Sequence, residues 1–233
     1  MKVELLAHTV ITDPALDLLP PLSPRSRDHT TSPDHLAEIA GRQCYKSWHR
    51  PNPGTAENAD YLAHILEIDH TSIMEHATAT FRLTGVSRNL LVELSRHRHL
   101  SPSVVSQRYV DESLGKFIVP PDLADDSDMD EIIKDMISHH SKMTHLYAKT
   151  VRAMVQKGYT RKQARQAARA ILPGGHETEI IVTGNIRAWR HVIHMRYSVH
   201  ADVEICRVAG EILEHLRKIA PHQVQDIEDD PRQ

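Results

Sequence analysis

The chain has 233 residues, a formal net charge of −3 at neutral pH and only 4% aromatic residues. This length can bury a substantial core, and the slight excess of acid argues against broad binding to nucleic-acid phosphates. Two cysteines, Cys44 and Cys206, are too few for a disulfide framework or a zinc set. No signal peptide opens the sequence and no apolar run is long enough for a bilayer, so we expect a cytoplasmic protein that does not span a membrane.

Alternating and helical hydrophobic patterns divide the first half of the chain into strands and helices. Ser32, Pro33 and Asp34 form a helix start, with a cap, a first-turn proline and an acid near the positive end of the dipole. The expected elements are a strand over 2–11, a proline-rich loop over 14–32, a helix from Ser32 to about Trp48, a helix after Thr55 and a strand over 77–86.

The second half is richer in helix. We interpret the long amphipathic segment as a packing helix, because Ile132, Ile133, Met136, Met143, Leu146 and Val151 recur along it. The expected elements are a helix capped by Ser87, an extended piece at 117–121, the long helix over about 128–158, a helix capped by Thr160, a strand over 179–183, a helix capped by Asn185, a helix over about 202–219 and an acidic tail at 225–233. The pattern predicts an α+β fold, with one domain over 1–233 and a mixed or antiparallel sheet flanked by helices.

The most informative stretch runs from Arg96 to Arg108 and reads RHRHLSPSVVSQR. Guanidinium groups match phosphate oxygens in two-point contacts, and serine hydroxyls add short donors. Pro102 ends any helix after Ser101, so we expect an irregular loop there. A helix end followed by a donor-rich loop could hold a phosphate and a pyrimidine. A solvated basic face would explain an isolated Arg-His-Arg equally well, but the full spaced pattern favours a binding site.

A second basic segment lies on the helix that begins after Thr160. Lys162, Arg165 and Arg169 share one helical face, while alanines supply the opposite face. Both an exposed basic stripe and an anion site remain possible, and the lack of interleaved acids favours the anion site slightly.

A third segment follows Asn185, which sits at a helix N-terminus where the dipole and free N–H groups favour an anion. Arg187 and His191 are four residues apart and should project together, as should Arg196 and His200 if the helix continues. His191 and a histidine three residues later could bind a metal, but no suitably spaced cysteine or acid completes a set, so we predict no metal.

Five motifs, taken together, resemble those of the flavin-dependent thymidylate synthases. They occur in the family's order between about Gly41 and about Arg207: RQCYKSW, HTSIMEHA, RHRHLSPSVVSQRYV, RKQARQAARAILP and TGNIRAWRH. Two positions depart from the family pattern. Val104 stands where relatives often carry Gln or Glu, and Pro102 stiffens the same loop.

The resemblance implies reductive methylation of dUMP to dTMP. Methylenetetrahydrofolate would give the carbon, with FAD as redox cofactor and NADPH as reductant. It also implies a homotetramer with sites between subunits, and no cysteine nucleophile. That agrees with Cys44 and Cys206, neither of which lies in an activated thiol motif.

The resemblance also assigns residues. It implies FAD contacts from His76, Thr78, Arg96, His97, Arg98, Asn185, Arg187 and His191, with Tyr45 near the ligands. It implies dUMP contacts from Arg88, Glu93, Ser106, Gln107, Arg108, Arg169 and Arg196. Among these, Arg196, Glu93 and Ser106 are the catalytic candidates, with Ser106 binding phosphate rather than attacking. Two rival hypotheses are a nucleic-acid-binding protein that uses the arginine helices and a flavin-binding module without catalysis.

Overall fold

A four-stranded antiparallel sheet organises the chain in the computed structural model, which describes residues 1–12, 30–47 and 52–229. Its strands are β1 (Lys2–His8), β2 (Thr78–Ser87), β3 (Ser101–Val104) and β4 (Glu177–Asn185), in the spatial order β1-β2-β4-β3. All three pairings are antiparallel, so the predicted α+β fold is confirmed and the sheet is antiparallel rather than mixed.

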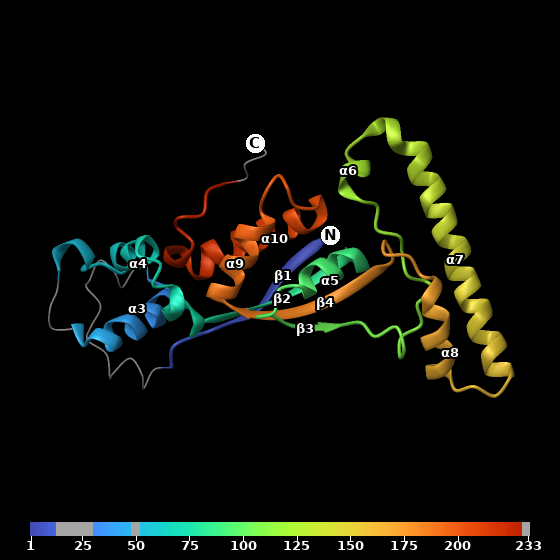
Figure 1. The fold of residues 1–233 in the computed structure, drawn as a ribbon, viewed down its shortest axis with the longest axis horizontal. Coiled ribbons are helices and arrows are strands. Elements are labelled where there is room, and N and C mark those ends of the chain that lie inside the picture. Colours follow the sequence, from blue (N-terminus) through green and yellow to red (C-terminus); the bar gives the residue numbers. More distant parts are fainter. Residues whose placement is uncertain (13–29, 48–51, 230–233) are drawn as a thin grey trace.

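The helices gather at three places around this sheet (Figure 1). Helices α9 and α10 pack along it, α3 and α4 lie at one end, and α7 and α8 form an arm at the other. The α-helices are α3 (Ser32–Tyr45), α4 (Asn58–Glu67), α5 (Arg88–Ser95), α6 (Pro121–Ala124), α7 (Asp130–Gln156), α8 (Arg161–Ala168), α9 (Ile186–Arg196) and α10 (Val203–Ile219). Short 3-10 helices are η2 (Pro53–Thr55), η3 (Thr71–Glu75), η4 (Ser127–Met129), η5 (Arg169–Ile171) and η6 (Pro221–Gln223). No helix of the described part is long and apolar enough to cross a bilayer.

The core lies between one face of the sheet and helices α9 and α10. Phe81 of β2 is fully buried and meets the Trp189 ring of α9 edge to face, with centroids 5.1 Å apart. The Trp189 indole N–H donates to the Ala79 carbonyl at 3.0 Å, so its one polar atom is satisfied. On the opposite face, Thr80 and Thr183 share a 2.9 Å hydrogen bond, so this face of the sheet is polar.

The predicted helix starts are correct at three positions. Ser87, Thr160 and Asn185 each accept a hydrogen bond from a backbone N–H in the first turn of the helix that follows. The first helix is capped one residue earlier than expected, by Thr31, whose hydroxyl accepts from the Asp34 N–H. That helix ends at Tyr45 rather than about residue 48, because Lys46 adopts the left-handed conformation with φ of 49°.

The irregular loop expected after Ser101 is wrong for residues 101–104, which form strand β3, and correct for residues 105–108. Pro102 does not prevent pairing, since β3 is an edge strand and a proline is tolerated where a strand has a neighbour on one side only. Val104 is partly buried and packs against the core. Its apolar character therefore has a structural reason in this chain.

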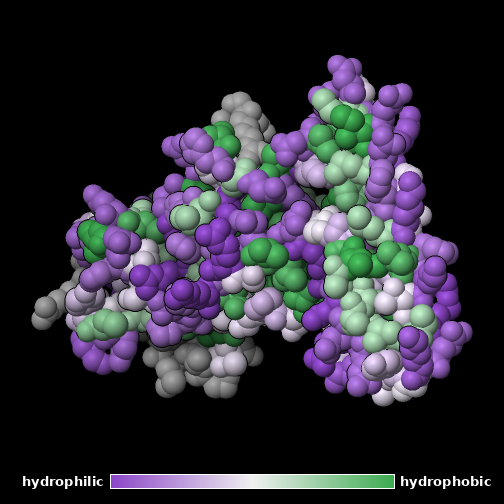
Figure 2. Space-filling view, turned by 45° about the vertical axis from the view of Figure 1, so that its right-hand side comes forward, coloured by the Kyte–Doolittle hydropathy of each residue, from purple (hydrophilic) through white to green (hydrophobic). Residues whose placement is uncertain are grey.

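Helix α7 forms as predicted, but most of its apolar stripe does not pack within this chain. The buried residues of α7 are His140, Thr144 and Tyr147. Its large apolar side chains are exposed by 38–51% at Ile132, Ile137, Met143, Leu146 and Val155. Figure 2 shows hydrophobic surface on the arm formed by α7 and α8.

The described part of the acidic tail, up to residue 229, packs against the rest of the chain. Asp226 forms an ion pair with Arg190 at 2.6 Å, and Ile227 packs against the core. Of the proline-rich loop predicted over 14–32, positions 14–29 lie outside the described residues, as do 230–233 of the tail.

Candidate active site

The predicted site residues form two clusters at opposite ends of α5. The cluster at its C-terminal end contains Glu93, His97, His191 and Arg196, and we call it the His97 cluster. The cluster at its N-terminal end contains Arg88, Arg108 and Arg169, and we call it the Arg88 cluster. Eight residues of helix separate Arg88 from Arg96, or about 12 Å at 1.5 Å per residue.

Two adjoining cavities open beside the His97 cluster. One, of about 210 Å³, is lined by Arg96, His97, Arg98, His99, Leu100, Ala188 and His191. The other, of about 370 Å³, is lined by Glu75, His99, Asn185, Arg187, Ala188 and His191. They share His99, Ala188 and His191, so the Arg-His-Arg segment and the first turns of α9 face one continuous hollow.

An interacting set of side chains fixes the His97 cluster. The Arg196 guanidinium pairs with the Glu93 carboxylate at 2.7 Å, and its Nε donates to His97 Nε2 at 3.0 Å. His97 must be neutral at Nε2 to accept this bond. Burial lowers the pKa of His97, and the positive charges of Arg196 and His191 lower it further. The His97 and His191 rings meet edge to face, with centroids 5.8 Å apart.

The N-terminus of α9 borders the larger cavity, but few of its N–H groups remain free. The Ile186 N–H donates to the Ala77 carbonyl at 2.9 Å, and the Ala188 N–H donates to Asn185 Oδ1 at 2.7 Å. Arg187 and His191 line this cavity together, as their spacing predicts. His200 does not extend the face, because α9 ends at Arg196.

The remaining residues assigned to the cofactor lie close to this hollow. Thr78 is the cross-strand partner of Asn185, and exposed His76 ends the short helix η3 just before it. Arg187 pairs with Glu75, the last residue of that helix, at 2.5 Å. Tyr45 lies on α3 and stacks on the His70 ring at 6.1 Å.

The Arg88 cluster has a different character. The Nη2 of Arg88 donates to the Val105 carbonyl at 2.9 Å. The Val105 N–H donates in turn to the Glu179 carbonyl, so the loop after β3 passes beside the start of β4. Burial lowers the pKa of Arg88, and the charge of nearby Arg169 contributes in the same direction. Arg108 follows in the same loop, and its N–H lies 3.4 Å from Ser106 Oγ.

Three guanidinium groups at this end have an unused donor. The Nε atoms of Arg88, Arg108 and Arg165 are buried without a hydrogen-bond partner among the described residues. Buried polar groups are nearly always paired in native proteins, and each unpaired donor is destabilising. Ser106 is exposed and Gln107 is partly buried, so both can approach a ligand there.

The basic face of α8 supports this loop. Arg165 donates to the Tyr109 carbonyl at 2.6 Å and approaches the Asp111 carboxylate at 3.5 Å. The Lys162 ammonium lies 4.9 Å from the centre of the Tyr109 ring. Two of the three predicted anion-binding residues of α8 therefore contact the motif loop, while Arg169 faces Arg88.

Strand β4 runs on the sheet side from the Arg88 cluster to the larger cavity. Its first residue, Glu177, pairs with Ser87 next to Arg88, and its last residue, Asn185, borders the cavities. A nine-residue strand covers about 27 Å between its end residues at 3.4 Å per residue. A single chain therefore presents Arg88, Arg108 and Arg169 apart from the predicted cofactor residues, whereas Glu93 and Arg196, also predicted to bind the substrate, lie in the His97 cluster.

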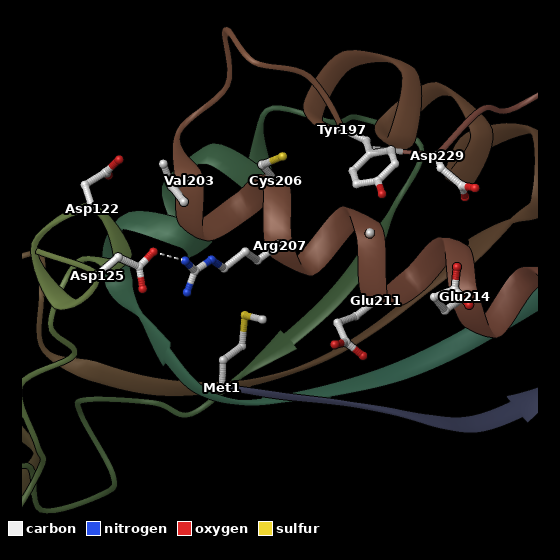
Figure 3. A pocket seen from close by; sticks show the side chains of 11 residues that line it. Met1, Asp122, Asp125, Tyr197, Val203, Cys206, Arg207, Glu211, Glu214 and Asp229 are labelled. Atoms are coloured by element: carbon white, nitrogen blue, oxygen red, sulfur yellow. Dashed lines mark hydrogen bonds and ion pairs between the residues drawn. The ribbon is translucent and has the colours of Figure 1, made fainter. Parts of the chain in front are cut away.

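A third cavity, of about 640 Å³, lies between α10 and α6, and Figure 3 shows that carboxylates dominate its lining. Among the described residues, Arg207 is the one basic side chain that lines it, and it pairs with Asp125. The remaining carboxylates are Asp122, Glu211, Glu214 and Asp229. This negative lining repels anionic nucleotides, so the cavity is a poor candidate despite its size.

The sequence analysis assigned no role to several residues around these clusters. Glu75 pairs with Arg187, while Glu112 and His176 lie behind Arg88. The Glu-His pair at 75–76 and the run Gly-Gly-His at 174–176 were visible, but nothing in their spacing indicates a partner so far along the chain.

The fold and the two clusters define a class of protein: an α+β protein with two separate clusters of basic side chains. A family model described as "Thymidylate synthase complementing protein" matches residues 27–222. A "Probable flavin-dependent thymidylate synthase" of Mycobacterium phage D29 is 47% identical over 99% of this chain and 98% of its own length. That of Mycobacterium phage L5 is 52% identical over 85% of this chain and 82% of its own.

A cellular relative gives the same result. The "Flavin-dependent thymidylate synthase" of Mycobacterium tuberculosis H37Rv is 46% identical over 98% of this chain and 90% of its own length. The chain therefore belongs to the flavin-dependent thymidylate synthase family, as its motifs predict. The crystal structure of thymidylate synthase X from Helicobacter pylori with FAD and dUMP has the same fold. Its TM-score is 0.61 at 20% identity, over 96% of this chain and 99% of that one.

Proposed function

We propose that this chain converts dUMP to dTMP, with methylenetetrahydrofolate as carbon donor, FAD as redox cofactor and NADPH as reductant. The observation that carries the proposal is the pair of basic clusters at the two ends of α5, in a chain of the flavin-dependent thymidylate synthase family. The flavin, when bound, supplies the redox chemistry that turns the transferred one-carbon unit into a methyl group.

The His97 end fits FAD in the chemistry of its donors. Arg96, Arg98 and Arg187 place guanidinium groups along the two adjoining cavities, and a cofactor diphosphate needs such forked donors. His97 and His191 offer flat rings beside them. We assign Arg96, His97, Arg98, Asn185, Arg187 and His191 to FAD, with His76 and Thr78 at the margin of the same hollow.

The Arg88 end suits the phosphate of dUMP. Arg88 and Arg169 lie close enough for their positive charges to interact, and Arg108 follows in the loop that Arg88 contacts. Arg88 and Arg108 each have a buried Nε–H group without a partner in the described residues. Phosphate oxygens are the natural acceptors for such groups. We assign Ser106 and Gln107 to the same ligand, with Ser106 as a phosphate donor and not as a nucleophile.

Arg196 and Glu93, which we assign to dUMP, belong to the His97 cluster. The Glu93 carboxylate and the His97 ring hold the Arg196 guanidinium from two sides. A guanidinium fixed in this way can stabilise the negative charge on the pyrimidine oxygens that makes C5 nucleophilic for its attack. Glu93 therefore has a positioning role and an available oxygen for the uracil ring.

We further propose that the active enzyme is a homotetramer whose sites combine the two clusters from different copies. The separation of the clusters along β4 and the unpaired guanidinium groups support this assembly. The exposed apolar side chains of α7 and the polar open face of the sheet supply surfaces for contact between copies.

The visible absorption spectrum of the purified protein tests the proposal. We expect a flavin spectrum that bleaches on addition of NADPH together with dUMP, and tritium release from dUMP labelled at C5 when methylenetetrahydrofolate is present. Bound flavin without tritium release would indicate a flavin-binding module. A colourless protein that binds nucleic acid with a steep salt dependence would indicate the other rival.

A further inference from the structure

A buried row of polar side chains extends from Arg88 into the arm. Arg88 Nη2 lies 3.3 Å from one oxygen of Glu112, and the other oxygen lies 2.8 Å from His176 Nε2. The second ring nitrogen of His176 lies 2.9 Å from His140 Nε2. His176 is 0% exposed, Glu112 5% and His140 6%. The row therefore joins the first residue of α5 to α7 through side chains that are almost completely buried beyond Arg88.

The chemistry of these groups fixes the direction of the hydrogen bonds. An ionised Glu112 accepts only, so His176 donates through Nε2–H to it. The neutral His176 ring then accepts at Nδ1 from the Nε2–H of His140. Burial lowers the pKa of His140, and the neighbouring His176 lowers it further, which agrees with a neutral His140 ring.

Close packing prevents the His176 ring from turning. A Cβ at Gly115 would lie 2.4 Å from two atoms of that ring, so only a glycine fits beside it. Phe117 forms an isolated β-bridge with His176, and its ring lies 5.6 Å from that of His140. The donor at His176 Nε2 is thus held toward the Glu112 carboxylate.

The geometry at Arg88 shows what this arrangement achieves. A carboxylate beside an arginine tends to form a two-point contact that occupies two guanidinium N–H groups. Here His176 takes one oxygen of Glu112, and the remaining oxygen makes a single, long contact to Arg88. The Nε–H of Arg88 stays without a partner among the described residues.

We infer that Glu112 and His176 are positioning residues for substrate binding, which hold Arg88 through its Nη2 group while the exposed part of its guanidinium stays available to the anionic part of dUMP. This inference rests on the proposed function, because it takes Arg88 as a dUMP-binding residue. Glu112 also balances the neighbouring charges of Arg88 and Arg169, which repel each other. His140 anchors the row to α7.

Two substitutions at His176 separate positioning from packing. His176→Gln keeps a donor near the position of Nε2, whereas His176→Asn keeps a polar group near Nδ1 and loses the contact to Glu112. By calorimetry on the FAD-loaded protein, we expect dUMP affinity within about twofold of wild type for His176→Gln and about tenfold weaker for His176→Asn. The flavin spectrum should be the same in all three proteins.

A double substitution provides the control. In an Arg88→Ala background, His176→Asn should cause no further loss of dUMP affinity, because it acts through Arg88. If His176→Asn does not fold, Glu112→Gln replaces it, with weaker dUMP binding expected in the wild-type background alone.

Equal losses for both His176 variants, or the same loss with and without Arg88, would show a packing role and overturn the inference alone. A folded, flavin-loaded wild type that does not bind dUMP would overturn the proposed function together with it.

Discussion

The two ends of α5 use their arginines in opposite ways. At the C-terminal end, Arg196 is already paired with Glu93 and His97, and Arg187 with Glu75, around cavities that the chain forms by itself. At the N-terminal end, the guanidinium Nε–H of Arg88 is buried without a partner in the described part of the chain. The comparison suggests a cofactor site that one chain largely preorganises and a phosphate site that needs a further molecule for completion.

The largest effect should come from removing a guanidinium at the incomplete end. Arg108→Ala should weaken dUMP binding strongly, since a charge-assisted hydrogen bond contributes about 1.5–3 kcal/mol. Titration calorimetry measures this loss, and the flavin spectrum should not change. Arg207→Ala is the matched control, because Arg207 faces the acidic cavity. Unchanged dUMP affinity in the Arg108 variant would contradict the assignment of the phosphate to the N-terminal end of α5.

A smaller effect should appear at the preorganised end as pH falls. The folded state lowers the pKa of His97 from its ordinary value of 6.5, mainly through burial and then through Arg196 and His191. The unfolded chain therefore binds the proton more readily, so stability contributed by neutral His97 is complete above about pH 6.5 and is lost as pH falls toward the folded pKa.

Thermal unfolding measured between pH 7.5 and 5.5 checks this sign. The melting temperature should fall less steeply with acid in His97→Gln than in wild type, because the glutamine does not titrate. Glu93 opposes the shift and Arg96 reinforces it, so the difference in slope should be modest. Parallel curves for the two proteins would show that His97 does not carry this charge sensitivity.

The smallest effect should come from Ser106→Ala. Ser106 is exposed and its hydroxyl accepts from the Arg108 N–H at 3.4 Å, and in the part of the chain that the structure describes no base contacts it that could activate it. We expect weaker dUMP binding with measurable turnover, as tritium release would show. Complete loss of turnover with intact nucleotide binding would instead make the serine a nucleophile.

Local patterns predicted the parts of the fold that depend on local physics. The caps at Ser87, Thr160 and Asn185 follow from side chains that satisfy N–H groups within one turn. Strand β3 was missed because of Pro102. A proline interrupts a helix, but a sheet tolerates it in an edge strand, and only the assembled sheet shows which strand lies at its edge. The exposed stripe of α7 could not be foreseen either, since periodicity identifies an apolar face without saying what covers it.

The candidate site also combines residues that the sequence motifs identify with contacts that only the folded chain shows. The spacing of Arg96, Arg98 and Arg108 identified the family, and the structure places these residues at two clusters that the motif alone does not separate. The row behind Arg88 joins residues 36 and 64 positions apart, so its partners emerge only from the folded chain. Long-range pairs of this kind lack a periodic signal in the sequence.

Mixing two defective variants tests the central claim most directly. Arg108→Ala disables the phosphate end and Arg187→Ala the cofactor end, so each should have low turnover alone. If sites combine the two ends from different copies, reassembly of a denatured mixture should restore activity through sites that receive both intact ends, and mass photometry should report tetramers. Activity in the reassembled mixture no higher than the average of the two variants would contradict the account, because it would place both ends of each site in one chain.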